Sequence, residues 1–414
     1  MPDATPKRTR KSFEPTLQGP LHGVRVVDIS RLVSGNVLST LLGDFGADVI
    51  KVEPPSGDPL RAWTDEGVSF YWKTYGRNKR SLVLDLRQKT AIDALLKLIK
   101  KSQVLVENFK PGTLEKMGLA PEVLLEVNPD LIIARISGFG QDGPYATMPG
   151  FGSLIEAMSG LASRTGFADR EPLLPPFPVA DMVAGVFGAL STLIALRANE
   201  QGISHGQVVD ISLLEPLFSL LGPEAGIFQL TGKVKPRVGS GSNTTAPRNV
   251  YRCSDGKYVA LSGSIQSMAE RIFEVIGRSD LVTDPRFRTN ADRIANRGEL
   301  DKILGSWFEG KKRDDVLELI RAAGATIGPV YAIDDALSDP HFIEREILID
   351  VDDDDLGTLV TQNIVPRLTE TPGGLRLAAP RIGQHSVEIL ELAGLGHDEI
   401  ETLIRSGSSF QDVR

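Results

Sequence analysis

The stretch VRVVDISRLVSGNVLSTLLGDFGADVIKVE, residues 24–53, decides the fold class. It predicts a buried strand over 24–30, a helix over 36–46 that ends at a glycine, and a second buried strand over 47–53. Two strands joined by a helix form a βαβ unit, in which the strands are parallel. The alternation continues with a further helix over 88–102. Four further strands are predicted over 81–86, 104–108, 131–137 and 207–212. We therefore expect an α/β fold with a large Rossmann-like domain and a mostly parallel sheet.

The character of the sequence changes near residue 231. The stretch TGKVKPRVGSGSNTTAPRN is rich in Gly, Pro, Ser and Thr, a composition typical of a long loop or linker. A hairpin is predicted around Asp255-Gly256, and helices follow it, which indicates a smaller α+β domain. We expect a disordered leader over 1–20 and a small domain over 231–330. The large domain is expected in two parts, 21–230 before the small domain and 331–414 after it.

Composition excludes several classes of function. The chain has 414 residues, enough for two domains, and a net charge of −8, which argues against a nucleic-acid partner. One cysteine, Cys253, and five scattered histidines leave no disulfide and no metal site of cysteines or histidines. The N-terminus lacks the apolar core of a signal peptide, and the apolar run after Asp181 is shorter than the roughly 20 residues that span a bilayer. We expect a cytoplasmic protein without a membrane partner, and a solvated turn rather than a calcium loop at 350–357.

Two stretches carry side chains suited to an anionic ligand. YGRNKRS, residues 75–81, concentrates Arg77, Lys79 and Arg80 before a strand, where they either face solvent or bind phosphate. VLVENFKPG, residues 104–112, ends a strand with an amide, an aromatic ring and a lysine. Ligands of open α/β sheets bind at the carboxyl ends of the strands, so this stretch is a candidate site. Glu53 ends the first βαβ unit as in dinucleotide folds, but the G-x-G-x-x-G turn is missing.

Asp181 precedes the longest apolar run, in PPFPVADMVAGVFGALSTLIALR, residues 175–197. By itself such an aspartate is typical of a helix N-cap, where it accepts hydrogen bonds from the first turn. The same geometry also holds an ionised, partly desolvated carboxylate where a substrate can reach it. The residues of this run do not choose between these interpretations.

The order of motifs along the chain resembles the family III CoA-transferases, of the formyl-CoA and carnitine CoA-transferase type. The resemblance rests on LHGVRVVDISRLVSG, LLGDFGADVIKVEPPSGDPLR, GRNKRSLVLDL, VLVENFKPGTLEKMGL, NPDLIIARISGFGQDGP and VADMVAG, and later on DPRFRTNADR, GPVYAIDDALSDPHF and IGQHSVEILELAGL. It extends over roughly residues 21–396. It implies a large domain built from both chain ends, a small domain in the middle, and an interlocked homodimer.

The resemblance also implies roles for individual residues. Asp181 matches the family's nucleophile, which forms anhydride and CoA-thioester intermediates, and no metal or permanently bound cofactor is implied. The residues that match contacts to coenzyme A are Val33, Ser34, Leu84, Arg87, Asn108, Phe109 and Lys116, and the basic turn adds Arg80. The loop 239–242 resembles a segment that covers the site in some members, although an interdomain linker is an equally good interpretation.

Alternatives remain open beside this assignment. α-Methylacyl-CoA racemases share the fold, but they need a histidine where this chain has Phe151, and Phe cannot move a proton. A non-catalytic CoA-binding protein would not need Asp181. The chain departs from the family at Ser34-Gly35-Asn36 and at Gly150-Phe151-Gly152, and Glu156 has no assignable role. Acyl-CoA and a carboxylic acid are the expected substrates, with succinyl-CoA as donor and a small dicarboxylate as acceptor.

Overall fold

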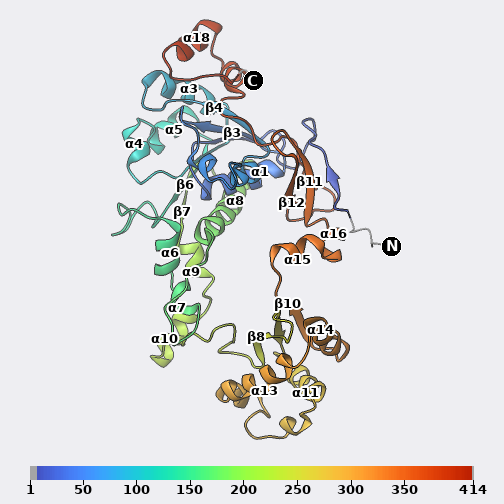
Figure 1. Ribbon diagram of the computed structural model, residues 1–414. Coiled ribbons are helices and arrows are strands. Elements are labelled where there is room, and N and C mark those ends of the chain that lie inside the picture. Colours follow the sequence, from blue (N-terminus) through green and yellow to red (C-terminus); the bar gives the residue numbers. More distant parts are fainter. Residues whose placement is uncertain (1–6, 413–414) are drawn as a thin grey trace. The chain divides into compact units, whose positions relative to one another are not determined.

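The protein is described here by a computed structural model, which describes residues 7–412. Its main element is a six-stranded parallel sheet in the order β4-β3-β2-β5-β6-β7 (Figure 1). The strands are β2 (Arg25–Asp28), β3 (Asp48–Glu53), β4 (Lys79–Val83), β5 (Val104–Glu107), β6 (Ile132–Ser137) and β7 (Gln207–Ser212). The predicted α/β fold with a parallel sheet is confirmed. All six strands lie between Arg25 and Ser212, so the sheet itself is not built from both chain ends.

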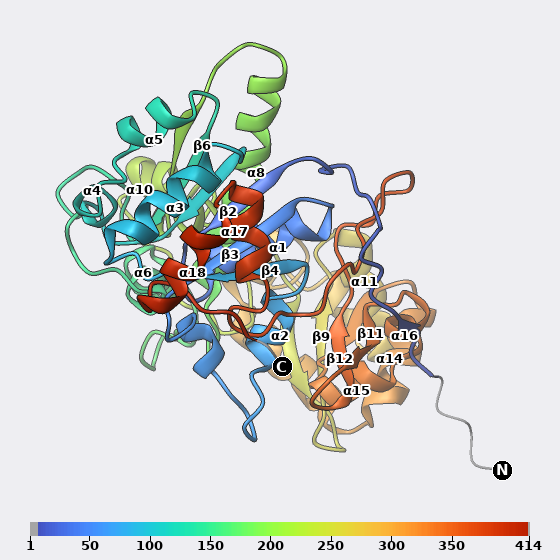
Figure 2. The same ribbon diagram turned by 90° about the horizontal axis from the view of Figure 1, so that it is seen from above.

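Helices cover both faces of the sheet. On one face, α1 (Ser34–Asp44) packs on β2 and β3, and α8 (Val179–Glu200) packs on α1, β6 and β7. On the other, α3 (Lys89–Ile99) packs with α5 (Pro121–Val127) and α17 (Ser386–Ala393), and α18 (His397–Arg405) follows (Figure 2). The apolar strand residues are therefore buried on both sides, as a parallel sheet requires. The C-terminal end of the chain contributes helices to this layer.

Short helices connect these elements. They are η1 (Pro59–Ala62), α2 (Phe70–Tyr75), α4 (Thr113–Lys116), α6 (Gly152–Met158) and α9 (Leu214–Ser219).

Two glycines explain how the apolar helix α8 approaches α1. A Cβ atom at Gly185 would lie 2.7 Å from the Val37 side chain and 2.8 Å from the Ser34 carbonyl oxygen, and one at Gly188 would lie 2.6 Å from Leu38. Only glycine permits this contact, although it lowers helix propensity. The contact brings the start of α8 next to the first turn of α1.

The length of α8 corrects one expectation. By length and composition, α8 is the one helix in the described residues that could cross a membrane, whereas the sequence run was expected to be too short. The physical reason is that the helix continues through Arg197 to Glu200, beyond the apolar run. It packs against α1, β6 and β7, as the core helix of a globular unit does.

A three-stranded sheet joins both chain ends in the order β1-β11-β12. It contains β1 (Arg10–Lys11), β11 (Leu348–Asp353) and β12 (Gly357–Gln362), after α16 (Pro340–Glu344). Residues 7–20 are therefore not the disordered leader expected from the sequence, since β1 pairs in parallel with β11 and Glu14 donates its N–H to the Leu375 carbonyl. Residues 1–6 of that leader lie outside the described residues. Of the solvated turn expected at 350–357, only residues 354–356 connect β11 and β12, because 350–353 belong to β11 and 357 begins β12.

Contacts divide the chain into two units. The first contains the described residues up to Ser159, Pro175–Gly222 and the described residues from Pro340 on, and the second contains Gly160–Leu174 and Pro223–Asp339. The sequence assigned 160–174 to the large domain, as part of 21–230. After α6 the chain turns at Gly160, which has a φ of 90° and precedes α7 (Leu161–Arg164).

The second unit has its own core. Its antiparallel sheet consists of β8 (Arg248–Arg252), β9 (Tyr258–Ser262) and β10 (Thr326–Pro329), and the hairpin predicted around Asp255-Gly256 is confirmed. Its further helices are α10 (Glu224–Thr231), α11 (Gln266–Val275), η2 (Ser279–Val282), α12 (Asn290–Ala295), α13 (Arg297–Glu309), α14 (Arg313–Ala322) and α15 (Ile333–Ser338). Apolar residues of the sheet and helices, including Phe273, Phe287 and Phe308, form one buried cluster.

Candidate active site

The parallel sheet reverses its direction of winding between β2 and β5. Strands β3 and β4 lie to one side of β2, and β5, β6 and β7 lie to the other. Loops diverge at such a point and leave a crevice at the carboxyl ends of the strands. Two cavities open there. Their walls include Arg31, which follows β2, and Phe109, which follows β5.

Asp181 lines the first cavity, which has a volume of about 360 Å³. It is the third residue of α8, and Pro178 occupies the N-cap position, so Asp181 does not cap the helix as the commonest interpretation would have it. The other walls are the turns after β2, β5 and β6 and the start of α6, with Ser34, Asn108, Ser137 and Phe151 among their residues. The carboxylate thus lies at a helix start and faces the crevice.

The charge state of Asp181 reflects its surroundings. Burial raises the pKa of the carboxyl, and the nearby Glu156 raises it further, whereas hydrogen bonds from the hydroxyl and backbone N–H of Ser34 lower it. The balance places the pKa at about 6. At neutral pH the group is still mostly ionised, but it is less stable as a carboxylate than an ordinary aspartate.

Gly152, the first residue of α6, leaves room for this carboxylate. A Cβ atom at this position would lie 2.6 Å from Asp181 Oδ2. Any side chain here would displace the Asp181 carboxylate from its position beside Ser34. The departure from the family pattern at Gly150-Phe151-Gly152 therefore opens space at the candidate nucleophile.

Asn108 fixes the turn between β2 and α1. Its Oδ1 accepts from the Arg31 N–H at 2.8 Å, its Nδ2 donates to the Arg31 carbonyl at 2.7 Å, and Nδ2 also lies 3.4 Å from Ser34 Oγ. The amide therefore joins the end of β5 to the residue that bonds Asp181. In the same turn, Leu32 has a φ of 61°, a left-handed conformation that is strained for a leucine, and its N–H donates to Asp58 at 3.0 Å.

A buried ionic network supports the turn from the core. Lys51 Nζ lies 3.2 Å from Asp28 and 2.9 Å from Asp58, and all three side chains are at most 1% exposed. Burial raises the pKa of Asp58, but Lys51 and the hydrogen bonds outweigh it and bring the pKa to about 2. The amide of Asn36 donates to Asp58, and Lys79 donates to the oxygens of Asn36. Burial lowers the pKa of Lys79 to about 7.

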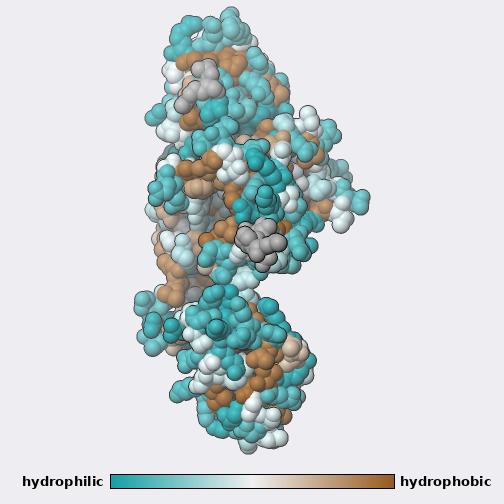
Figure 3. Space-filling model, turned by 45° about the vertical axis from the view of Figure 1, so that its right-hand side comes forward, coloured by the Kyte–Doolittle hydropathy of each residue, from teal (hydrophilic) through white to brown (hydrophobic). Residues whose placement is uncertain are grey.

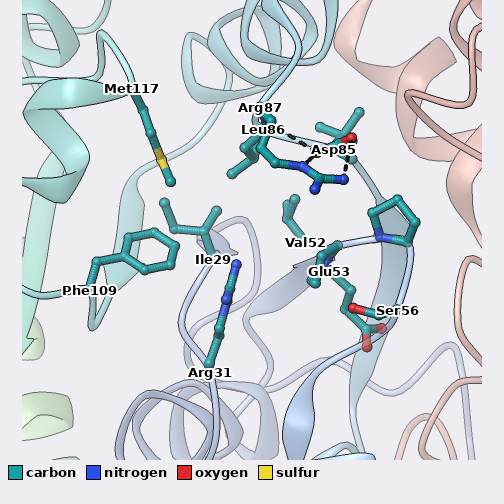
Figure 4. Close-up of a pocket in the computed structure, with 13 residues that line it drawn as sticks. Ile29, Arg31, Val52, Glu53, Ser56, Asp85, Leu86, Arg87, Phe109 and Met117 are labelled. Carbon is teal, nitrogen blue, oxygen red and sulfur yellow. Dashed lines mark hydrogen bonds and ion pairs between the residues drawn. The ribbon is translucent and has the colours of Figure 1, made fainter.

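The second cavity has a volume of about 480 Å³ and lies over the ends of β2, β3 and β4 (Figure 4). Figure 4 shows the Arg31 side chain pointing into it, with Phe109 and Met117 on one side and Glu53 and Ser56 on the other. Leu84 and Arg87 belong to the same wall, and Arg87 Nε donates to Asp85 at 2.7 Å.

The two cavities share Arg31 and Phe109. The Arg31 guanidinium lies 5.4 Å from the centre of the Phe109 ring, within the range of a cation–π contact. A long ligand that passes this pair can occupy both cavities. Within the described part of the chain, no group of three His, Cys, Asp or Glu side chains is arranged to hold a metal ion.

Comparison with known families identifies this arrangement. The model of the family described as "CoA-transferase family III" matches residues 21–386. The chain belongs to CoA-transferase family III. The sequence resemblance is confirmed, and the enzyme is a transferase of the EC 2.8.3 type that acts on CoA thioesters.

Individual relatives of this family III transferase span nearly its whole length. It is 40% identical over 389 residues to the succinyl-CoA–D-citramalate CoA-transferase of Chloroflexus aurantiacus, with 93% of this chain and 96% of the relative covered. It is 30% identical over 394 residues to the succinyl-CoA:glutarate CoA-transferase of Mus musculus, with 94% and 90% covered.

Solved structures agree with this membership. A CAIB/BAIF family protein from Brucella suis superposes with a TM-score of 0.81 at 31% identity, over 91% of this chain and 100% of the other. The orthorhombic form of Rv3272 from Mycobacterium tuberculosis gives a TM-score of 0.80 at 28% identity, over 90% and 99%.

Most of the sequence-predicted residues of the family III transferase gather at these cavities. Ser34 and Asn108 line the first, Leu84 and Arg87 line the second, and Phe109 lines both. Three do not line either cavity. Val33 is 1% exposed and packs in a cluster with Leu60 and Trp72, Lys116 is exposed, and Arg80 bonds Asp48 and Glu388.

The cations of the basic turn at 75–81 do not line either cavity. Arg77 forms a buried pair with Asp44, Lys79 is 0% exposed, and Arg80 donates to Asp48. Arg77 and Lys79 therefore neither face solvent nor offer their charge to a phosphate, because both side chains turn inward to partners distant in sequence. The cation that lines both cavities, Arg31, was missed. Its place directly after the first predicted strand was the signal that could have found it.

Proposed function

We propose that this family III CoA-transferase uses Asp181 as its nucleophile. The observation that carries the proposal is a half-buried carboxylate with a pKa of about 6, which lies in the first turn of α8 and lines a cavity at the switch point of the sheet. A carboxylate with weakened solvation is a better nucleophile than one in water, and a thioester carbonyl is a reactive target.

Coenzyme A would extend across both cavities. In this arrangement its nucleotide end occupies the cavity of Leu84, Arg87 and Met117, and its thioester lies in the cavity of Asp181. Both cavities are lined by Arg31 and Phe109, which supports a path for the coenzyme from one cavity to the other past these two side chains. The Arg31 guanidinium is suited to a phosphate group there.

The proposed reaction has four steps. The Asp181 carboxylate attacks the donor thioester carbonyl, the C–S bond breaks, and CoA leaves as a thiolate from a mixed anhydride. The thiolate attacks the aspartyl carbonyl of this anhydride, which forms an aspartyl-CoA thioester and releases the donor acid. The acceptor carboxylate attacks that thioester, giving a second anhydride and the thiolate again. The thiolate finally attacks the acceptor's acyl carbonyl, and Asp181 leaves as a carboxylate.

We propose succinyl-CoA as the donor and a small dicarboxylic acid as the acceptor. Relatives named as succinyl-CoA transferases of D-citramalate, L-malate and glutarate support this, at 40%, 37% and 30% identity. The first cavity also presents two cations, Arg31 and Lys110, that could pair with the distal carboxylate of either acid. Racemisation finds no support, because Phe151 lines the cavity where a histidine would be needed, and no histidine lines it.

The test is transfer of CoA from succinyl-CoA to a panel of acids, with Asp181→Ala beside wild type. We expect the variant to lose transfer while CoA still binds, and wild type to form a trappable adduct on the peptide that contains Asp181. Asp398→Ala is the matched control, because Asp398 also lies in the first turn of a helix of the first unit but lines neither cavity. Transfer at the wild-type rate by Asp181→Ala would refute the assignment.

We also propose a homodimer in the cytoplasm. One face of α8 leaves Val186, Leu190 and Ile194 each more than half exposed, which is costly in water and favours a second copy of the chain as cover. Figure 3 shows apolar surface, in brown, along the left-hand side at the height of α8 in Figure 1. Sedimentation should give twice the chain mass, and Leu190→Lys should weaken the dimer. A stable wild-type monomer would refute this.

A further inference from the structure

Glu156 is the one carboxylate that contributes to the charge state of Asp181. It lies on α6, its side chain is 2% exposed, and no lysine or arginine of the described residues forms an ion pair with it. A buried charge without a partner is expensive, so such a residue calls for an explanation.

The contact that Glu156 does make is to the helix of the candidate nucleophile. Its Oε1 accepts from the Ala180 N–H at 3.2 Å, in the first turn of α8 and one residue before Asp181. The start of α6 also abuts Asp181, since Gly152 leaves space for Oδ2. Glu156 therefore holds the backbone from which Asp181 projects, and its charge lies close enough to disfavour ionisation of Asp181.

We propose that Glu156 is a positioning residue whose negative charge favours acylation of Asp181. This inference rests on the proposed function. The free enzyme carries two carboxylates in one poorly solvated place. When Asp181 becomes an anhydride or a CoA thioester, its charge is gone, and the repulsion with Glu156 is relieved. The repulsion therefore raises the free energy of the resting carboxylate relative to the covalent intermediates.

No lysine or arginine is among the main influences on the raised pKa of Asp181. Arg31 and Lys110 line the same cavity from the turns after β2 and β5. Four other charged residues lie on elements packed against α8 but do not line this cavity. They are Asp44 on α1, Arg135 on β6, Asp210 on β7 and Glu215 on α9. Asp44 pairs with Arg77, and Arg135 pairs with Glu107 and Glu115.

Two variants separate the charge of Glu156 from its hydrogen bond. Glu156→Gln keeps an oxygen that can accept from the Ala180 N–H but removes the charge, whereas Glu156→Ala removes both. We expect Glu156→Gln to move the acid limb of the pH profile of kcat/KM to lower pH. We also expect it to lower the amount of aspartyl adduct formed from succinyl-CoA at pH 8 by roughly tenfold, which corresponds to one pKa unit of lost repulsion. Glu156→Ala should show the same shift and, in addition, a loss of kcat.

Glu215→Gln is the matched control, because that carboxylate also bonds near a helix start, at Ser212, yet it does not line the cavity of Asp181. It should keep the wild-type profile. If wild type forms the adduct on Asp181 but Glu156→Gln keeps its pH profile and adduct level, the role of Glu156 is refuted and the proposed nucleophile stands. If wild type forms no adduct on Asp181 with any acyl-CoA, the proposed function fails, and this inference fails with it.

Discussion

The first turn of α1 contacts two groups of buried carboxylates, and the structure treats them in opposite ways. Asn36 bonds Asp58, whose charge is compensated by Lys51, and the pKa of Asp58 falls to about 2 despite its burial. Two residues earlier, Ser34 bonds Asp181, no lysine or arginine is among the main influences on this carboxyl, and the pKa of Asp181 rises to about 6. Burial acts on both acids in the same direction, so the presence or absence of a cation decides the outcome.

The comparison shows where the fold is stabilised and where it is kept reactive. A buried acid that is paired with lysine and fully hydrogen-bonded is held in one charge state and supports the turn. An acid left without a cation costs stability as a carboxylate, and that cost is available to a reaction that removes its charge. Substitutions at Lys51, Asp181, Gly152 and Ser34 alter the paired acids or the unpaired acid separately.

The largest effect is expected from removing the compensating cation. Lys51→Met leaves Asp28 and Asp58 buried without their partner, and the free energy of unfolding should fall by about 3–5 kcal/mol. Urea denaturation followed by circular dichroism measures this. Lys89→Met removes an exposed pair with Asp93 and should cost about 0.5 kcal/mol or less. Equal losses in the two variants would show that the network does not support the fold.

The opposite sign is expected at the uncompensated acid. The pKa of Asp181 is raised from 3.8 to about 6, so its penalty to stability is absent below about pH 4 and is complete above about pH 6. Asp181→Asn should therefore be more stable than wild type by about 2–3 kcal/mol at pH 8, and equally stable at pH 4. Denaturation at both pH values measures the difference. A gain of the same size at pH 4 would exclude ionisation as its cause.

Filling the space beside Asp181 should damage activity without damaging the fold. Gly152→Ala places a methyl group where Oδ2 lies, so the carboxylate must move, and we expect kcat/KM to fall about 100-fold. Alanine is the better helix residue, so the melting temperature should not decrease. Steady-state kinetics and a thermal melt on the same preparation test both parts. Activity near wild type would mean that the position of the carboxylate is not critical.

The smallest effect is expected from removing the hydroxyl that partly compensates Asp181. Ser34→Ala should raise the pKa of Asp181 further, because a donor to the carboxylate is lost. At pH 6 the ionised fraction then decreases, and kcat/KM should fall about 3–5-fold, with a smaller loss at pH 8.5. A pH profile of kcat/KM measures this. A shift of the acid limb to lower pH would contradict the role assigned to Ser34.

The fold and part of the site could be predicted from the sequence because they depend on local patterns. Buried strands alternating with helices predicted the parallel sheet, and Asn108 and Phe109 could be placed at a strand end. Both bounds of β7 were predicted correctly, as residues 207 and 212. Asp181 was noticed as the one charged residue before the longest apolar run, but its role as nucleophile came only from the resemblance to the family.

What could not be predicted depends on partners distant in the chain. Nothing near Lys79 indicates that it is buried, because its partner Asp28 lies 51 residues earlier. Residues 10–11 form a strand because they pair with β11, which lies more than 300 residues later in the chain. In the same way, the role of Glu156 follows from a bond to Ala180, and a single sequence does not show which helix start faces which side chain.

The position of α17 and α18 has a consequence for synthesis of the chain. Ile389, Leu390 and Leu403 belong to the same buried cluster as Leu82 and Leu95, so part of the cover of one face of the parallel sheet is made long after its strands. The second unit ends at Asp339 and can close its own core before that. A nascent chain therefore carries a partly uncovered apolar face of the sheet until residues 386–405 have been synthesised, and a chain that stops before residue 386 is exposed to chaperones and proteases.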